Sequence, residues 1–335
     1  MGVRLVVGVV LVAAALAACA APPAAGAAPV AGAAPAAGDP GAPARQRLVV
    51  HGTGDVSLDP GYLPVLREQG WGHAWSGLGG LFTSDDLTIV NLECPVSRRG
   101  TAVEKEFAFR CDPAALPAAH AAGVDVANFA NNHVRDYGEQ ALLDSLAHAR
   151  EAGIAPVGVG ADLAAATAPA VVERGGWRIA VLGFGGVVPS AEWLATPRSP
   201  GLASGDDTAL MVEAVRAADA VADLVFVTVH WGMELDTQPR ADDVRRAEAM
   251  IDAGADGIFG HHQHRLGPLG WHRDRPIAWG LGNFVWPRLS AESARTAVAQ
   301  FVVEPDGSVR GCLLPAVIVS SGHPELTGPR TCPTS

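Results

Sequence analysis

Short apolar runs alternate along the chain with longer segments in which apolar residues recur every three or four positions. The runs are rich in β-branched residues and stop at turn formers, which is typical of buried strands. They cover residues 47–56, 87–92, 124–129, 177–184, 224–230 and 257–260. The longer segments have the period of helices that pack on a sheet, and they cover residues 139–152, 207–222 and 241–253. This alternation predicts a layered α/β domain.

The last part of the chain has strand patterns with no helical segment between them. Strands are predicted at 276–285, 297–303 and 309–319. The turn Pro305-Asp306-Gly307 predicts that the last two strands form a hairpin. We therefore expect a folded domain over residues 47–321 and a C-terminal tail over residues 322–335.

The first residues have the pattern of an export signal. Arg4 precedes an apolar run that ends at Leu16, shorter than the roughly 20 apolar residues of a membrane-spanning helix. Leu16-Ala17-Ala18-Cys19 resembles the bacterial lipobox, in which the signal is cut before a Cys that then carries lipid. We expect a lipoprotein signal peptide at 1–18, lipid on Cys19 and an Ala-, Pro- and Gly-rich tether at 19–46. The alternative is ordinary cleavage without lipid.

Charge narrows the range of partners. The formal net charge is −11, and Lys105 is the single lysine of the chain. No Lys- or Arg-rich block is present, which argues against nucleic acid as a partner and against a polybasic membrane patch. We therefore expect an extracytoplasmic protein that is anchored to the cell membrane through its N-terminal lipid.

Four cysteines remain besides Cys19, and an even number in an exported protein indicates two disulfides. Three pairings are open. We favour Cys94 with Cys111 and Cys312 with Cys332, because each pair closes a short local loop. A cysteine metal site is the alternative, although no C-x-x-C spacing supports it.

Side chains that can bind metal fall where the predicted strands stop, which is where α/β sheets build their sites. They are Asp55, Glu93, the cluster Asn131-Asn132-His133 with Asp136, His230, and His261, His262 and His264. Imidazole nitrogens together with carboxylate and amide oxygens suit Mn, Fe or Zn better than Mg or Ca. Two such metals could share a bridging carboxylate and activate water for attack on a phosphorus or carbonyl centre.

Each cluster alone also has a structural explanation. A Gly-Asp pair after a strand is often a turn, Asn131 and Asn132 could cap a strand end, and His230 could be a core histidine. Three histidines within residues 261–264 are harder to explain without metal. The repeated placement of such clusters at strand ends argues against coincidence.

The chain resembles the capsule-synthesis protein CapA family, which is associated with poly-γ-glutamate synthesis and has a domain similar to the calcineurin-like metallophosphoesterases. The resemblance rests on Gly54-Asp55-Val56, Asn91-Leu92-Glu93, the segment from Ala130 to Gly138, His230-Trp231-Gly232-Met233-Glu234, Gly260-His261-His262-Gln263-His264 and Leu281-Gly282-Asn283-Phe284. It implies a four-layer α/β/β/α sandwich of the metallophosphoesterase type, with two mixed sheets flanked by helices.

The resemblance also implies residue roles. One or two divalent metals would be held by Asp55, Glu93, Asn132, His230, His262 and His264, and His133 would be the catalytic acid oriented by Asp136. Asn131, His261, Glu234 and Asn283, with Trp231, Trp279 and Trp286, are candidates for a substrate pocket, although core packing explains at least half of the tryptophans. Two positions depart from the pattern: Ser57 stands where a His ligand is expected, and Glu93 replaces the bridging Asp.

Two classes of function follow from these residues. In the first, the domain is a metal-dependent hydrolase or transferase that acts outside the membrane on an envelope polymer or on a phosphoester. In the second, it is a non-catalytic accessory of a membrane synthase, where it binds a nascent anionic polymer such as poly-γ-glutamate and helps to export or anchor it. The departures at Ser57 and Glu93 keep both classes open.

Overall fold

The computed structural model describes residues 44–333. The expected signal peptide, Cys19 and nearly all of the expected tether lie outside these residues. Within the described part, none of the helices combines the length and the apolar character that a membrane crossing requires.

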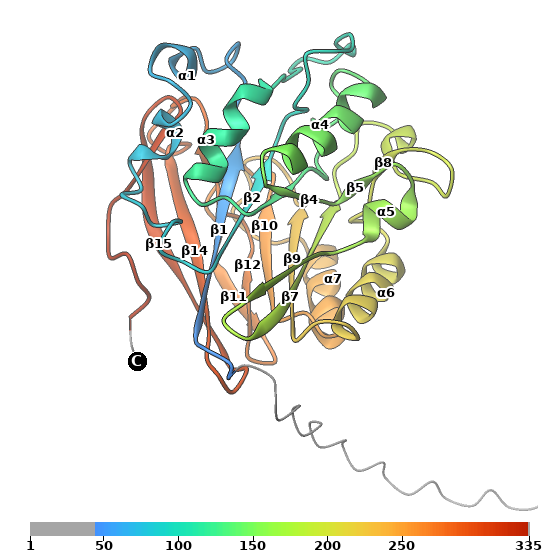
Figure 1. Cartoon of the computed structure of the whole chain (residues 1–335), viewed down its shortest axis with the longest axis vertical. Helices are drawn as coiled ribbons and strands as arrows, with labels where there is room; N and C mark the ends of the chain where they lie inside the picture. Colours follow the sequence, from blue (N-terminus) through green and yellow to red (C-terminus); the bar gives the residue numbers. More distant parts are fainter. Residues whose placement is uncertain (1–43, 334–335) are drawn as a thin grey trace, which may run out of the picture. The chain divides into compact units, whose positions relative to one another are not determined.

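Two mixed β-sheets form the centre of the described domain (Figure 1). The first contains, in spatial order, β16 (His323–Leu326), β15 (Val309–Ser320), β14 (Arg295–Val303), β1 (Leu48–Val56), β2 (Leu87–Leu92), β3 (Val126–Asn128) and β4 (Ala155–Val157), while β13 (Asn283–Val285) also pairs with β1. The second contains β11 (Leu269–His272), β12 (Arg275–Ala278), β10 (Gly257–His261), β9 (Leu224–His230), β7 (Trp177–Gly185) and β6 (Ala170–Arg174). A small third sheet joins β5 (Val159–Gly160) to β8 (Gly201–Leu202).

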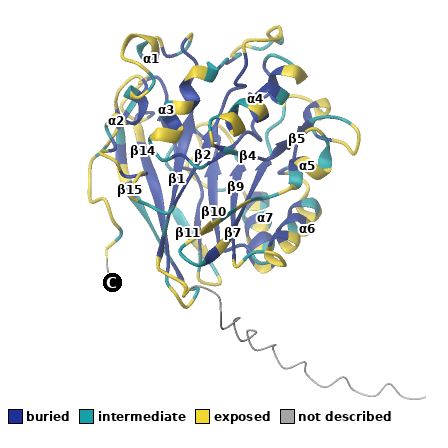
Figure 2. Cartoon of the chain, in the orientation of Figure 1, coloured by how far each residue is buried: buried dark blue, intermediate teal, exposed yellow. Residues whose placement is uncertain are grey.

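Helices cover the outer faces of both sheets. The helices on the first sheet are α1 (Val65–Glu68), α2 (His73–Ser76), α3 (Leu116–Ala121) and α4 (Glu139–Glu151), together with the 3-10 turn η1 (Pro113–Ala115). Those on the second are α5 (Leu163–Thr167), α6 (Thr208–Asp219) and α7 (Ala241–Asp252), and the 3-10 turn η2 (Ala191–Trp193) lies beside β8. A third apolar cluster fills the space between the sheets. The predicted four-layer α/β/β/α arrangement is confirmed, and Figure 2 shows the central strands buried and the helices with exposed outer faces.

The inner faces of the strands change character along their length. In β2, Leu87 and Ile89 pack between the sheets, and Asn91 follows two residues later on the same face. In β9, Phe226 packs in the same core and His230 ends the row. The inter-sheet space is therefore apolar near the start of the parallel strands, and polar side chains meet where these strands end.

The prediction of a single strand over residues 276–285 is wrong. Residues 275–278 form β12 of the second sheet, whereas residues 283–285 form β13 of the first sheet. Between them Gly282 has a φ of 72°, and its carbonyl accepts a hydrogen bond from Asp55 N at 2.8 Å. A Cβ on Gly54 would lie 2.1 Å from this carbonyl oxygen, so both glycines permit a close crossing. Apart from Asn283 the run is apolar, because the crossing itself is buried.

The ends of the domain are held by pairing and by disulfides. Within the segment expected to be a tail, β16 pairs with β15 in antiparallel fashion. The structure joins Cys94 to Cys111 and Cys312 to Cys332, the pairs that the loop lengths favour. The short elements β4, β5, β6, β8, β11, β16, α1, α2, α3 and α5 were not expected from the apolar pattern, since they are too short to show a period.

Candidate metal centre

The predicted ligands meet between the two sheets. Asp55 lies near the end of β1 and Glu93 directly follows β2, while His230 ends β9 on the opposite sheet. The loop after β3 supplies Asn132, and the loop after β10 supplies His262 and His264. The strands that carry these residues run parallel, so their carboxyl ends share one edge and bring the ligands together.

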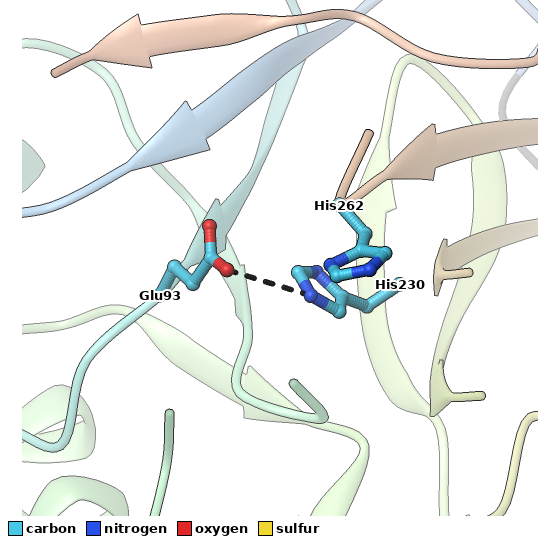
Figure 3. Close-up of side chains that lie close together, drawn as sticks. All are labelled: Glu93, His230 and His262. Atoms are coloured by element: carbon cyan, nitrogen blue, oxygen red, sulfur yellow. Dashed lines mark ion pairs between the residues drawn. The ribbon is translucent and has the colours of Figure 1, made fainter. Parts of the chain in front are cut away.

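Two sets of side chains share Glu93 and so form one continuous group of candidate ligands, which we call the metal cluster. One set is Glu93, His230 and His262 (Figure 3), and the other is Asp55, Glu93 and His264, and within each set the donor atoms lie within 4.8 Å of one another. His230 Nε2 is 3.5 Å from Glu93 Oε1, and His264 Nδ1 is 3.1 Å from Asp55 Oδ2. Glu93 belongs to both sets, which is the position that a bridging carboxylate requires.

The cluster meets the requirements of a divalent cation. Glu93 is fully buried, yet neither of its carboxylate oxygens has a hydrogen-bond partner among the described residues. Nδ1 of His262 is likewise buried without a partner there. A buried carboxylate without a hydrogen bond is costly, and buried charges are normally hydrogen-bonded or bind metal. The donor set of carboxylates and imidazoles therefore fits a divalent metal ion.

The carboxylates share one small space and influence each other. Burial raises the pKa of Glu93 well above its usual value, and the neighbouring charge of Asp55 raises it further. Burial also acts to raise the pKa of Asp55, but His264, His261 and Asn91 outweigh it and hold that pKa below its ordinary value. Burial acts to lower the pKa of His264, but Glu93 and Asp55 outweigh it and raise that pKa to about 9. A bound cation would relieve this repulsion between carboxylates.

The other histidines are held in the neutral form that binds metal. Burial lowers the pKa of His230 well below its usual value, and His262 adds to this effect. The pKa of His262 and that of His261 are each lowered to about 4, chiefly by burial. The rings of His230 and His262 lie with centroids 4.7 Å apart (Figure 3).

The backbone at two of the ligands adopts an uncommon conformation. Only a few non-glycine residues of the described chain have a positive φ, and His262 at 94° and His264 at 51° are among them. Such conformations cost about 1–3 kcal/mol and concentrate at functional sites. These backbone bends allow His262 and His264, which are two residues apart, both to direct their imidazole rings toward the carboxylates of Asp55 and Glu93.

His133 and Asp136 lie beside the metal cluster. Asp136 Oδ2 is 2.6 Å from His133 Nδ1 and also accepts a hydrogen bond from Phe109 N at 2.8 Å. Nδ1 thus faces Asp136 and also lies 3.1 Å from Lys105 Nζ, whereas Nε2 faces Glu93 Oε1, 3.9 Å away. Burial lowers the pKa of His133, although Asp136 opposes this effect. The arrangement is suited to proton exchange at Nε2.

Two residues of the site were not predicted from the sequence. Lys105 Nζ lies 2.9 Å from Asp136 Oδ1 and also donates to the backbone oxygen of Asn132. Asn91 Nδ2 donates to Asp55 Oδ1 at 2.9 Å and lies 3.1 Å from His230 Nδ1. Each residue has a sequence feature that could have pointed to it, because Lys105 is the single lysine and Asn91 shares the inner face with Glu93. Neither feature shows which residues Lys105 and Asn91 will contact, because those contacts depend on how a long loop and the second sheet fold.

A cavity of about 250 Å³ opens over the metal cluster. Its lining includes the predicted His133, Glu234, His264 and Asn283, and also Trp286. Asn283 Nδ2 donates to Ser293 O at 3.3 Å, whereas its Oδ1 has no partner among the described residues. An acceptor is therefore free near the cavity for a substrate donor.

Asn131 and His261, also predicted for the pocket, do not line this cavity. Asn131 is buried, and its amide donates to Leu92 O at 2.9 Å and accepts from His133 N at 3.1 Å. Nε2 of buried His261 is 2.9 Å from Thr228 Oγ1, and its Nδ1 lies 3.9 Å from Asp55 Oδ1. Both residues therefore contact the site from the protein interior, and neither faces the cavity.

Four further positions that the sequence analysis singled out lie in different parts of the structure. Trp231 and Trp279 stack on each other in the core beneath the second sheet's helices, whereas Trp286 packs 4.8 Å from the ring of His264. Ser57 Oγ accepts a hydrogen bond from Asp59 N at 3.4 Å and is not among the clustered donor atoms. The structure thus offers no replacement at this position for the histidine that the metallophosphoesterase pattern places there.

Comparisons with known proteins identify the family. A probable polyglutamine synthesis accessory protein of Mycobacterium tuberculosis is 34% identical over 262 residues, covering 73% of this chain and 68% of that protein. Capsule biosynthesis protein CapA of Bacillus anthracis is 28% identical over 84% of this chain and 69% of its own length. The corresponding values for PGA biosynthesis protein CapA of Bacillus subtilis are 29%, 77% and 68%.

Among solved structures, the sulfate thiohydrolase SoxB of Thermus thermophilus aligns with a TM-score of 0.42 and 18% identity, over 68% of this chain and 38% of that structure. The model of the bacterial capsule synthesis protein PGA_cap matches residues 49–288, which include every predicted metal ligand. The chain belongs to the bacterial capsule synthesis protein PGA_cap family.

Proposed function

We propose that this chain acts on poly-γ-glutamate or a related anionic envelope polymer, as a metal-dependent accessory of its synthesis, export or anchoring. The observation that carries the proposal is the buried cluster built around Glu93, in a chain whose relatives are named for capsule and PGA synthesis. Within the described chain the Glu93 carboxylate oxygens and His262 Nδ1 are buried without a hydrogen bond, and a cavity lies above them, which supports a binding or reactive centre over a purely structural core.

The residues divide into two groups by what they would do. Asp55, Glu93, Asn132, His230, His262 and His264 would hold one or two ions of Mn, Fe or Zn. A bound ion supplies a Lewis acid that polarises the reacting carbonyl or phosphoryl group and lowers the pKa of water. Hydrolysis of a γ-glutamyl amide adds water across the C–N bond, and the departing nitrogen needs a proton.

His133 is placed to deliver that proton. Its Nδ1 is held by Asp136, so its Nε2 is free on the side of the cluster and the cavity. Phe109 stacks on the ring with centroids 4.3 Å apart, which fixes the ring plane and shields its face from water. Lys105 Nζ contacts Asp136 Oδ1 at 2.9 Å, and this contact holds the carboxylate that orients His133.

A variant series tests this proposal. The full chain would be assayed for bound metal and for cleavage of poly-γ-glutamate, as the wild type and as His262→Ala, His133→Ala and His272→Ala. His262→Ala should lose metal and cleavage together, whereas His133→Ala should keep its metal and lose about 100-fold or more in cleavage. His272 contacts Asp252 on the surface, away from the site, and His272→Ala should behave as wild type. Equal cleavage by His133→Ala would refute the acid/base assignment.

A second candidate is a site that binds polymer without cutting it. The position of Ser57 favours it, because the hydroxyl is bonded to Asp59 N and adds no ligand where a histidine is expected. In that case the wild type binds both metal and polymer but releases no shorter chains. The same assay separates the two candidates, since binding and chain length are measured on the same sample.

We also propose that the protein works outside the cytoplasmic membrane, held there by lipid on Cys19. The support comes from the sequence, in which the apolar run and Leu16-Ala17-Ala18-Cys19 have the order of a lipoprotein signal. A membrane-bound polymer synthase would then be a natural partner, because both would meet the growing polymer at the same surface.

A further inference from the structure

A larger cavity adjoins the one that lies over the metal cluster. Its volume is about 590 Å³, and it shares the side chains of Tyr62, Phe107 and Phe109 with the smaller cavity. The volume falls within the roughly 300–1,000 Å³ that ligand pockets occupy. A ligand longer than the smaller cavity can therefore continue into the larger one past these aromatic rings.

Three arginines line the larger cavity in a chain that is acidic overall. The Arg110 guanidinium lies 3.4 Å from the centroid of the Tyr137 ring and donates to Gly100 O at 2.9 Å. Arg67 is exposed, and its guanidinium forms no hydrogen bond or ion pair with another described residue. Arg98 is paired with Asp112 at 2.7 Å. Two of the three cations thus lack a carboxylate partner within the described chain.

The acidic residues of the cavity are largely engaged by other groups. Asp59 accepts hydrogen bonds from Gly61 N at 2.7 Å and from Arg110 N at 2.8 Å. Asp112 accepts from Ala114 N at 3.0 Å in addition to Arg98. Glu106 is exposed and unpaired by any described cation. The groups left free to attract an incoming ligand include the guanidinium groups of Arg67 and Arg110.

The wall of the cavity is fixed relative to the metal cluster. Cys111 lines the cavity and is joined to Cys94, the residue next to Glu93. On the other side, the Arg110 guanidinium stacks on the ring of Tyr137, and Tyr137 directly follows Asp136 in the sequence. The distance between Arg110 and the metal cluster is therefore set by covalent and stacked contacts on both sides.

We propose that the larger cavity binds the free carboxylates of an extended polycarboxylate chain whose reacting unit lies at the metal cluster, an inference that rests on the proposed function. Guanidinium groups bind carboxylates through paired, charge-assisted hydrogen bonds. The faces of Tyr62, Phe107 and Phe109 provide apolar contact for the methylene groups between the carboxylates. The arginines would set the register of the chain, and the metal cluster would act on one linkage.

Fluorescence anisotropy of the full metal-loaded chain tests the proposal, with labelled poly-γ-glutamate oligomers as the probe. Arg67→Glu and Arg110→Gln should each weaken oligomer binding by about tenfold or more, because each removes a charge-assisted contact. Arg216→Glu is the matched control, since Arg216 is exposed on α6 and lines neither cavity. Metal content and the far-ultraviolet circular dichroism spectrum should be unchanged in Arg67→Glu.

The outcomes separate this inference from the proposed function. If wild type binds the oligomer and both arginine variants bind it equally well, the cavity assignment is overturned while the proposed function stands. If wild type does not bind the oligomer at all, both fall together. Weakening by Arg216→Glu to the same extent would show that only overall charge matters and would also overturn the assignment. Tighter binding of polyphosphate than of poly-γ-glutamate would overturn the carboxylate specificity.

Discussion

Lys105 shows how much a single side chain can contribute to this site. Its ammonium group is paired with fully buried Asp136 and is itself only 20% exposed. Removing one partner of a buried pair leaves the other charge uncompensated, which costs about 3–5 kcal/mol. The partly exposed position of Lys105 places the expected loss at the lower end of that range.

Lys105→Met should therefore lower the free energy of unfolding by about 3 kcal/mol, measured by urea denaturation. Arg99→Met is the comparison, because Arg99 pairs with Asp144 but is 65% exposed. That substitution should cost no more than about 1 kcal/mol. Equal losses in the two variants would show that Asp136 does not depend on the lysine.

Asp256 gives the domain a pH dependence away from the metal cluster. Burial raises the pKa of this carboxyl to about 6, although Val225 N and Arg275 oppose the effect. The folded state therefore holds its proton at pH values where the unfolded state, with a pKa near 3.8, has lost it. By linkage, stability falls as the pH rises from about 4 to about 6 and is then constant.

Over that window the wild type should lose up to about 3 kcal/mol more stability than Asp256→Asn, since one pKa unit corresponds to about 1.4 kcal/mol. Urea denaturation of both proteins at several pH values between 4 and 7 measures the difference. Parallel pH profiles for the two proteins would contradict a raised pKa for Asp256.

At the scale of elements, the segment between Cys94 and Cys111 covers the site. It supplies Lys105 and Phe109, and its disulfide closes a loop with a sequence separation of 17. The second disulfide, Cys312 with Cys332, has a similar separation of 20 but links β15 to the end of the described chain. The two bridges should stabilise the fold similarly but differ in their effect on the site.

Replacing both members of either bridge with serine should lower the free energy of unfolding by about 3 kcal/mol. Only Cys94→Ser with Cys111→Ser should also weaken metal binding, because Glu93 adjoins Cys94 and the covering segment becomes free. Competition with a metal-binding dye measures the affinity. Equal weakening of metal binding by the Cys312 and Cys332 replacements would show that the effect is global.

At the scale of the whole molecule, the sequence is acidic, has one lysine and contains no Lys- or Arg-rich block of the kind that binds an anionic membrane. Attachment would depend on the lipid. Cys19→Ser should move the protein from the membrane fraction to the soluble fraction of expressing cells, as followed by immunoblotting, and the folded domain should keep its metal content. Retention of Cys19→Ser in the membrane fraction would show that another segment or a partner provides the anchor.

Local pattern and resemblance together predicted the layers of the domain and the identity of the ligands. Strands such as β2, β9 and β15 were predicted nearly to the residue, because each has one or two buried faces and a turn former at its end. The CapA-type motifs pointed to Asp55, Glu93 and the histidines after β10, and the structure brings these residues together. Short elements such as β6 and α5 were not predicted, since a few residues cannot display a period.

The sequence by itself determined which side chains stand at the strand ends, the family and the favoured disulfides, because motifs, spacing and local loop length are properties of the chain. Only the tertiary structure decided that residues 276–285 cross from one sheet to the other, that Asn91 links Asp55 to His230, and that Lys105 contacts Asp136. These contacts join segments far apart in sequence. Their partners are set by the packing of two sheets against each other, which no local pattern encodes.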